Sequence, residues 1–182
     1  MSIMALATQA EGYRNVLFTL TFKNDERVLR KAVKLHTTLV QEMLKESPDG
    51  DFETQCFFQP FPTVVGKHSA ERGGNILEVD AITDKAVVWL GFLAVNGVDQ
   101  ESIARKKMLA WKDAIEEYSR TVGAYLGYKY ANYADQPQDV MESYGKANFR
   151  KMMAVSERYD QDRVFQSRIP GGLKLLGTET AF

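Results

Sequence analysis

The ten residues from Ala86 to Val95 form a nearly continuous apolar run that contains Trp89 and Phe92. Runs of β-prone residues like this one are typical of a strand that is buried on both faces. Asn96 and Gly97 follow the run and end it. It is also far shorter than the ~20 apolar residues that a helix needs to cross a bilayer. We therefore expect a sheet with this segment as its central strand.

Other segments show the period of two that predicts a strand, or the spacing that predicts a helix. Further strands are expected over residues 15–23, 52–61 and 125–134. Helices are expected over residues 28–43, 103–122 and 141–158, and a loop with room for one helical turn over 63–75. This order of elements indicates an α+β fold, a single domain in which an antiparallel β-sheet is covered on one face by helices.

The composition excludes several classes of function. A net charge of −1 gives no electrostatic footprint for nucleic acid or for an anionic membrane surface. Cys56 is the single cysteine, so an internal disulfide is excluded, and two histidines without ligand spacing predict no metal site. The first residues lack the cationic start of a secretory signal. We expect a cytoplasmic protein with no nucleic-acid, membrane or metal partner.

The most specific motifs lie in the second half of the chain. They are Tyr130-Ala-Asn132-Tyr133-Ala-Asp135, then Tyr144-Gly145 and residues 159–165, preceded by Gln59-Pro-Phe-Pro62, His68 and Arg72-Gly-Gly-Asn75. Over roughly residues 15–175 they resemble the C-terminal substrate domain of fungal FAD-linked oxidoreductases of the berberine-bridge-enzyme type. The resemblance implies a substrate domain over residues 15–182 after an N-terminal extension of residues 1–14. It leaves out the N-terminal FAD-binding domain, so no cofactor is expected unless another chain carries FAD.

Alternation also predicts which side chains line the sheet face that the helices leave open. Phe18, Leu20 and Phe22 should pack under the helices. The expected open face combines hydroxyls, amides and aromatic rings: Thr19, Thr21, Gln55, Phe57, Gln59, Trp89, Tyr128, Tyr130 and Asn132. His68 could reach this face from its loop, whereas Tyr133 should point to the opposite one. An amphipathic cleft of this kind is usual for a small-molecule site.

Tyr130 and Gln59 are the expected catalytic residues. In the family, the tyrosine that matches Tyr130 deprotonates a substrate hydroxyl. Gln59 or Tyr130 could instead donate a hydrogen bond to a substrate carbonyl. The structural alternative for Tyr130 is a tyrosine that edges the core with its hydroxyl in water.

Three functions fit these features. The first is a stand-alone, flavin-free relative of the substrate domain that binds an apolar metabolite and guides a redox-neutral cyclisation, such as an intramolecular Diels–Alder reaction, in fungal natural-product biosynthesis. The second is the substrate-binding subunit or a fragment of a split FAD-dependent oxidoreductase. The third is a non-catalytic module that binds a hydrophobic small molecule. Because exposed apolar faces mark interaction sites, a homodimer is also expected.

Overall fold

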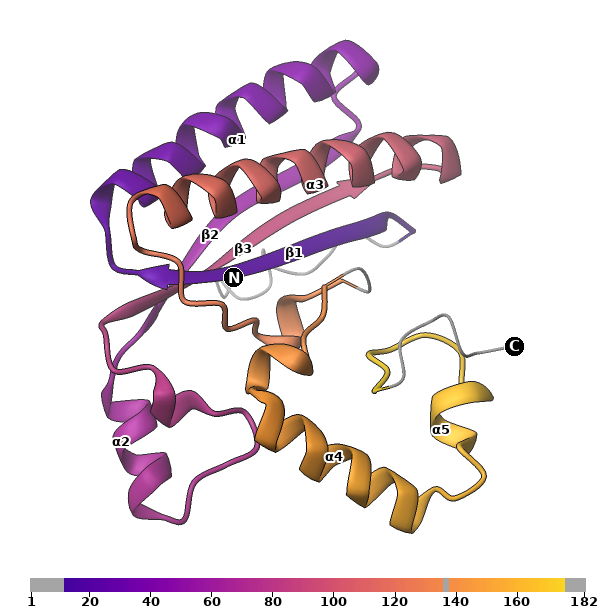
Figure 1. Cartoon of the computed structure of the whole chain (residues 1–182). Helices are drawn as coiled ribbons and strands as arrows, with labels where there is room; N and C mark the ends of the chain where they lie inside the picture. The colour runs from indigo at the N-terminus through magenta and orange to yellow at the C-terminus, as the bar shows by residue number, and fades with distance from the viewer. Residues whose placement is uncertain (1–11, 136–137, 176–182) are drawn as a thin grey trace, which may run out of the picture.

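A three-stranded antiparallel sheet is the frame of the structure, a computed structural model that describes residues 12–135 and 138–175 (Figure 1). Its strands are β1 (Arg14–Lys23), β2 (Phe52–Phe61) and β3 (Ala86–Val95), and their order across the sheet is β1-β3-β2. Both outer strands pair with β3 along their whole lengths. The apolar run is thus the central strand, and the α+β class predicted from the sequence is confirmed.

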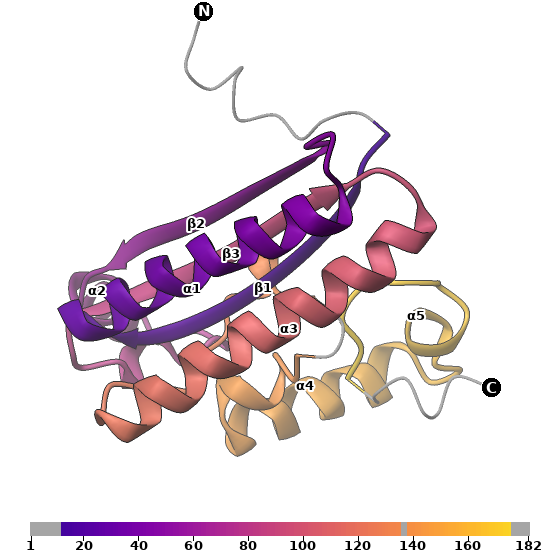
Figure 2. The same cartoon turned by 90° about the horizontal axis from the view of Figure 1, so that it is seen from above.

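Two long helices cover one face of the sheet, as Figures 1 and 2 show. They are α1 (Glu26–Glu46) and α3 (Val98–Thr121). Asp25 caps α1, because its carboxylate accepts a hydrogen bond from the backbone N–H of Arg27 and satisfies a free donor of the first turn. On the other side of the sheet lie three shorter helices, α2 (Val64–Glu71), α4 (Lys146–Tyr159) and α5 (Val164–Ser167).

The main apolar core lies between the sheet and the two long helices. Phe18, Leu20 and Phe22 of β1 are buried in it, which confirms the face that alternation assigns to them. Trp111 of α3 meets Trp89 of β3 edge to face, with the ring centres 4.8 Å apart. Burial of apolar surface, at about 25 cal/mol per Å², therefore holds α1 and α3 against the sheet.

The fourth strand expected over residues 125–134 does not form. Two backbone hydrogen bonds, of 2.8 and 3.1 Å, join residues 124–126 to the free edge of β1, and the pairing stops there. Gly127 then adopts a φ of +76°, which other residues rarely adopt, and the chain leaves the edge. It continues into a 3-10 helix, η3 (Ala131–Tyr133), in place of extended chain. The period-two tyrosines suggested a strand, but the glycine interrupts it.

Besides both ends of α1 and the start of α3, which extend a few residues beyond the expected ranges, two boundaries differ from the expectation. The helix expected over residues 141–158 begins only at Lys146, because Gly145 with a φ of +84° separates α4 from a short 3-10 helix, η4 (Glu142–Tyr144). Residues 63–75, expected as a loop with at most one helical turn, contain the eight-residue helix α2. The elements of the sheet and its two covering helices are unaffected by these shifts.

Cys56 on β2 should be almost unreactive in the folded protein. Burial raises the pKa of its thiol to about 11, and its Sγ accepts a hydrogen bond from Trp89 Nε1 at 3.4 Å. Because the thiolate is the nucleophile, alkylation by iodoacetamide at pH 8 should be at least about a hundredfold slower than in urea-unfolded protein. Mass spectrometry of timed samples measures both rates. Equal rates would contradict the packing of Cys56 beneath Trp89.

Candidate functional site

The sheet face opposite α1 and α3 has a covered half and an exposed half. Cross-strand register places Thr19 and Thr21 of β1 on this face together with Gln55, Phe57 and Gln59 of β2, in agreement with the alternation of the sequence. On β1, Thr19 and Thr21 are fully buried and Leu17 is partly buried, whereas Phe57 of β2 is 47% exposed. Along the described strands, β2 therefore offers a ligand the easier approach to this face.

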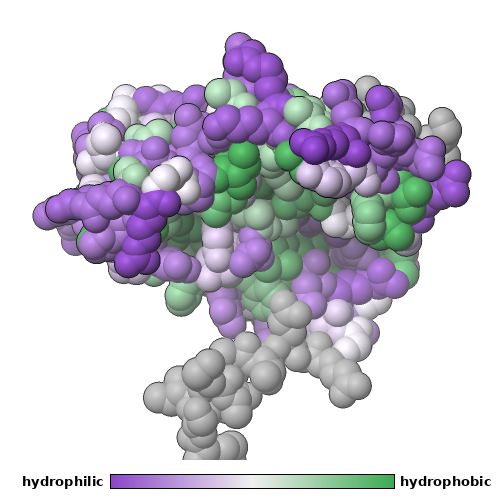
Figure 3. All heavy atoms as spheres, turned by 90° about the horizontal axis from the view of Figure 1, so that it is seen from below, coloured by the Kyte–Doolittle hydropathy of each residue, from purple (hydrophilic) through white to green (hydrophobic). Residues whose placement is uncertain are grey.

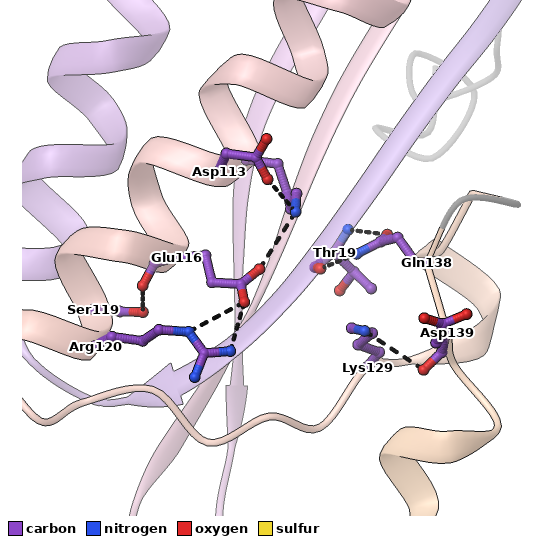
Figure 4. Close-up of polar contacts among 9 residues, drawn as sticks. Thr19, Asp113, Glu116, Ser119, Arg120, Lys129, Gln138 and Asp139 are labelled. Carbon is purple, nitrogen blue, oxygen red and sulfur yellow. Dashed lines mark hydrogen bonds and ion pairs between the residues drawn. The ribbon is translucent and has the colours of Figure 1, made fainter.

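Thr19 and Thr21 differ from the expectation in accessibility, since both are 0% exposed. The hydroxyl of Thr19 donates to the carbonyl of Trp89 at 2.9 Å. At the outer edge of β1, the Gln138 carboxamide accepts from the Thr19 N–H at 3.0 Å and donates to the Thr19 carbonyl at 2.7 Å (Figure 4). Gln138 thus makes the two hydrogen bonds that a neighbouring strand would make. Neither threonine can contact a ligand beneath this cover.

Residues 124–135, which follow α3, run close to the edge of β1. Charged side chains of α3 contact this segment at two points. Arg120, which pairs with Glu116 on the same helix (Figure 4), places its guanidinium carbon 3.8 Å from the ring centre of Tyr125. Further along, Asp135 forms an ion pair with Arg105. The residues between these two anchors are therefore held close to the sheet edge.

Between the anchors and β2 lies a contiguous group of side chains, the tyrosine–amide cluster, formed by Gln59, Tyr130, Asn132 and Tyr133. Tyr133 donates its hydroxyl hydrogen to Gln59 Oε1 at 2.9 Å. Its ring stands at 90° to the Tyr130 ring, with the centres 4.9 Å apart. Asn132 Nδ2 donates to the Tyr130 hydroxyl oxygen at 2.9 Å. The structure thus brings together three residues that the sequence nominates, Gln59, Tyr130 and Asn132.

Tyr133 is the member of the cluster that sequence reasoning missed. Alternation along an assumed strand placed it on the face opposite Tyr130. The 3-10 turn of η3 removes that alternation, and Tyr133 reaches Gln59 instead. Its place directly after Asn132 in the motif was the available signal, but the assumed strand gave it the wrong direction.

Trp89 does not line this face, contrary to the expectation. It is 0% exposed and lies on the helix-covered side, against Trp111. β3 is apolar on both faces, so its sequence lacks the alternation of polar and apolar residues that would distinguish the two faces. Leu90, which pairs in register with Phe57, takes the place expected for Trp89.

Tyr128 is also inaccessible to a ligand. It is 5% exposed and packs between Phe61 and Tyr144, with ring centres 5.8 and 5.7 Å away, in a small second core that includes Val79. Burial raises the pKa of its hydroxyl, and the neighbouring Tyr144 and Tyr130 raise it further. Tyr130 is partly buried against this second core. Tyr128 therefore supports the tyrosine–amide cluster without being part of its accessible surface.

The remaining expected site residues stay at the surface. His68 lies on α2 rather than in a loop, and its Nδ1 is 3.2 Å from Glu71 Oε2 on the same helix. The structure does not bring it to the tyrosine–amide cluster. Gln55 and Phe57 are exposed on β2 close to Gln59, so both are available to a ligand there.

The surface on the side of α2, α4 and α5 is hollowed at its centre, and apolar side chains gather in the hollow within a hydrophilic rim (Figure 3). On this side a groove of about 530 Å³ lies between α4 and α5 and is lined mainly by apolar side chains: Ile76, Met141, Met152, Val155, Tyr159 and Phe165. No sequence pattern indicated this groove. Apolar residues at helical spacing predict a buried face, whereas Val155 and Tyr159 are 57% and 74% exposed.

The strand–helix connections of the described residues contain no glycine-rich turn of the kind that binds the phosphates of a dinucleotide cofactor. A phosphate-binding strand–turn–helix carries several glycines, whereas the β1–α1 connection has none and the β3–α3 connection has only Gly97. The same described ranges hold no group of three or more His, Cys, Asp or Glu placed for a metal ion, and no helix with the length and apolarity to cross a membrane.

Comparison with known proteins points to flavin-dependent enzymes of fungi. The chain is 35% identical over 180 residues to FAD-dependent monooxygenase drtC of Aspergillus calidoustus, and 32% identical over 166 residues to FAD-dependent monooxygenase sdcF of Emericella nidulans. A third relative, bifunctional solanapyrone synthase of Alternaria solani, is 29% identical over 121 residues, which are 65% of this chain and 22% of the synthase. No family model and no solved structure matches the chain.

The matches cover most of this chain but only a part of each relative. The two monooxygenase alignments cover 96% and 90% of this chain but 34% of each relative. The chain thus spans about a third of the length of these two curated relatives. It is similar, over nearly its whole length, to one part of fungal FAD-dependent monooxygenases.

Proposed function

We propose that this chain supplies the substrate-holding part of an enzyme that acts on apolar small molecules, as a counterpart of one part of FAD-dependent monooxygenases. The tyrosine–amide cluster carries the proposal, because it joins Gln59 of β2 to Tyr130 and Asn132 beside the exposed Phe57. Small-molecule sites commonly combine apolar walls with a few placed polar groups. The exposed half of the sheet face offers that combination.

The hydrogen bonds within the cluster leave donors for a ligand. Asn132 donates to the Tyr130 oxygen, so the hydroxyl hydrogen of Tyr130 is left for another acceptor. Gln59 accepts through Oε1, so its Nε2 retains two hydrogens to donate. A carbonyl oxygen on an apolar molecule would satisfy these donors while its hydrocarbon part lies against Phe57. This chemistry would orient the ligand and polarise its carbonyl.

The resemblance to berberine-bridge-type oxidoreductases gives the proposal a redox version. FAD, when bound to such an enzyme, supplies the acceptor for a hydride from the substrate. In this version the present chain would hold the substrate, and the Tyr130 hydroxyl would form a hydrogen bond with the substrate hydroxyl and orient it. The phosphates and adenine would need residues other than those in the described ranges, which lack a glycine-rich phosphate turn.

A redox-neutral version is favoured by the neutral character of the tyrosine–amide cluster, which consists of two phenols and two carboxamides. Donors of this kind can hold a flexible polyene with a terminal carbonyl in a reactive conformation, and preorganisation alone can contribute about 7–11 kcal/mol to an intramolecular reaction. An intramolecular cyclisation of the Diels–Alder type is the matching reaction. Bound flavin makes a protein yellow, so an absorbance spectrum of the purified protein separates the two versions.

Binding of a carbonyl probe tests the proposal directly. Tyr130→Phe and Gln59→Leu should each weaken the binding of 2-acetylnaphthalene about three- to tenfold, since each removes one hydrogen-bond donor and little volume. Titrations followed by ¹H–¹⁵N NMR spectra give the dissociation constants. Gln41→Leu, on the exposed face of α1, is the matched control and should bind like the parent protein.

Two results would count against the proposal. The first is that the parent protein shows no shifts along β2 when the probe is added. The second is that the probe shifts only residues of the α4–α5 groove, which would move the binding function there. The expected homodimer remains a separate prediction. A second copy that covered the exposed half of the face would compete with the probe for this surface.

A further inference from the structure

Tyr133 connects two parts of the chain that are distant in sequence, strand β2 and the segment after α3. Its hydroxyl donates to Gln59 Oε1 at 2.9 Å, and its ring edge meets Tyr130 with the ring centres 4.9 Å apart. It is partly buried, so both contacts are sheltered from water on one side. It therefore touches both of the residues that the proposed function uses as donors.

We propose that Tyr133 is the positioning residue of this site, which fixes the Gln59 carboxamide so that Nε2 and not Oε1 is offered to a ligand. The inference rests on the proposed function and adds a ligand class to it. The site would select apolar compounds that carry a carbonyl acceptor over otherwise similar compounds without one.

The reason lies in the two-fold choice that a carboxamide has. A glutamine side chain can turn about its last torsion angle and present either its oxygen or its nitrogen, because that torsion has only a broad, roughly two-fold preference. Tyr133 favours one orientation, because its hydroxyl donates to Oε1 when that atom faces it. In the opposite orientation Nε2 would donate to the phenol oxygen instead, and the hydroxyl hydrogen of a partly buried phenol would lose its acceptor on Gln59, which is unfavourable.

The polarity of the neighbouring pair agrees with this role. Asn132 Nδ2 donates to the Tyr130 hydroxyl oxygen at 2.9 Å, which leaves the Tyr130 hydrogen as the unused group. The edge-on ring of Tyr133 limits the positions that the Tyr130 ring can take. Gln59 and Tyr130 therefore both present donors, and Tyr133 contacts both residues.

A pair of matched probes tests the inference, 2-acetylnaphthalene with a carbonyl and 2-ethylnaphthalene with a methylene in its place. The parent protein should bind the ketone about ten- to hundredfold more tightly than the hydrocarbon, because Tyr130 and Gln59 each contribute about three- to tenfold. Tyr133→Phe should reduce this ratio about three- to tenfold, because Tyr130 still donates, while leaving the affinity for the hydrocarbon unchanged. The Gln59 side-chain amide signals in ¹H–¹⁵N spectra should shift with the ketone in the parent and not in Tyr133→Phe, an effect that a merely structural role would not produce.

Two further variants complete the test. Tyr118→Phe, on α3 at the helix-covered side of the sheet, also removes one phenol oxygen and should keep the parental ratio. Gln59→Glu keeps an acceptor for Tyr133 but has no Nε2, so it should lose the Gln59 share of the preference for the ketone, and it gives a readout even if Tyr133→Phe fails to fold. A parental ratio in Tyr133→Phe would overturn the inference and leave the proposed function standing. A parental ratio in Gln59→Glu would overturn the inference and also exclude Gln59 as a donor of the proposed function. Failure of the parent to bind either probe would overturn both.

Discussion

Replacing Trp89 with alanine should lower the free energy of unfolding by about 3–5 kcal/mol, because the change leaves a large cavity in a core that cannot fully collapse. The side chain is 0% exposed, packs edge to face on Trp111 and donates its indole N–H to Cys56. Small domains are stable by only about 5–15 kcal/mol, so the variant should lose a large part of its stability. Urea unfolding followed by far-ultraviolet circular dichroism measures the loss.

Phe57→Ala is the matched control, since it removes an aromatic side chain from the opposite face of the same sheet. Phe57 is 47% exposed, so its loss should cost less than about 1 kcal/mol. It should instead weaken the binding of 2-acetylnaphthalene. If Phe57→Ala were the strongly destabilised variant and Trp89→Ala the weak binder, the assignment of the two sheet faces would be reversed.

Gln138→Leu should cost about 2–4 kcal/mol of stability, because it leaves a buried N–H and a buried carbonyl of Thr19 without partners. The Gln138 side chain is 6% exposed and makes both hydrogen bonds, at 3.0 and 2.7 Å, to the backbone of the edge strand. Urea unfolding gives the change in stability. Hydrogen exchange of the Thr19 amide gives a local measure, and its protection should fall in the variant.

A graded control follows from the chemistry of the side chain. Gln138→Glu keeps an oxygen that can accept from the Thr19 N–H but loses the N–H₂ group that donates to the Thr19 carbonyl. It should therefore protect the Thr19 amide better than Gln138→Leu does. An unchanged Thr19 amide in Gln138→Leu would show that another group covers this edge.

The sequence predicted the faces of β1 and β2 because both strands alternate in polarity. Phe18, Leu20 and Phe22 lie under the helices, and Phe57 and Gln59 lie on the other face. The same reasoning failed for β3, where both faces are apolar and residue type carries no direction. Only the register with its two neighbours, a property of the folded sheet, determines which face each residue takes.

Three of the four residues of the tyrosine–amide cluster were predictable from the sequence, but the contacts that join them were not. Tyr130, Asn132 and Gln59 stand in motifs that can be read from the sequence, and the structure joins them. Tyr133 was assigned the wrong direction, because the strand that would have set its direction does not exist. Propensity and spacing could not show that Gly127 ends the pairing with β1 or that a glutamine side chain continues it.

The strand order β1-β3-β2 has a consequence for how the chain reaches its fold. Both outer strands pair with β3, and the short bridge from β1 to residues 124–126 comes later in the chain, so no hydrogen bond between described strands can form before Ala86–Val95 is available. The closest pair in sequence, Phe61 with Ala86, closes the shortest loop and costs the least chain entropy. β2 and β3 should therefore meet first, and β1, although synthesised earliest, should join last. Contacts so distant in sequence favour refolding in roughly milliseconds to seconds, slower than in a helical bundle of similar size.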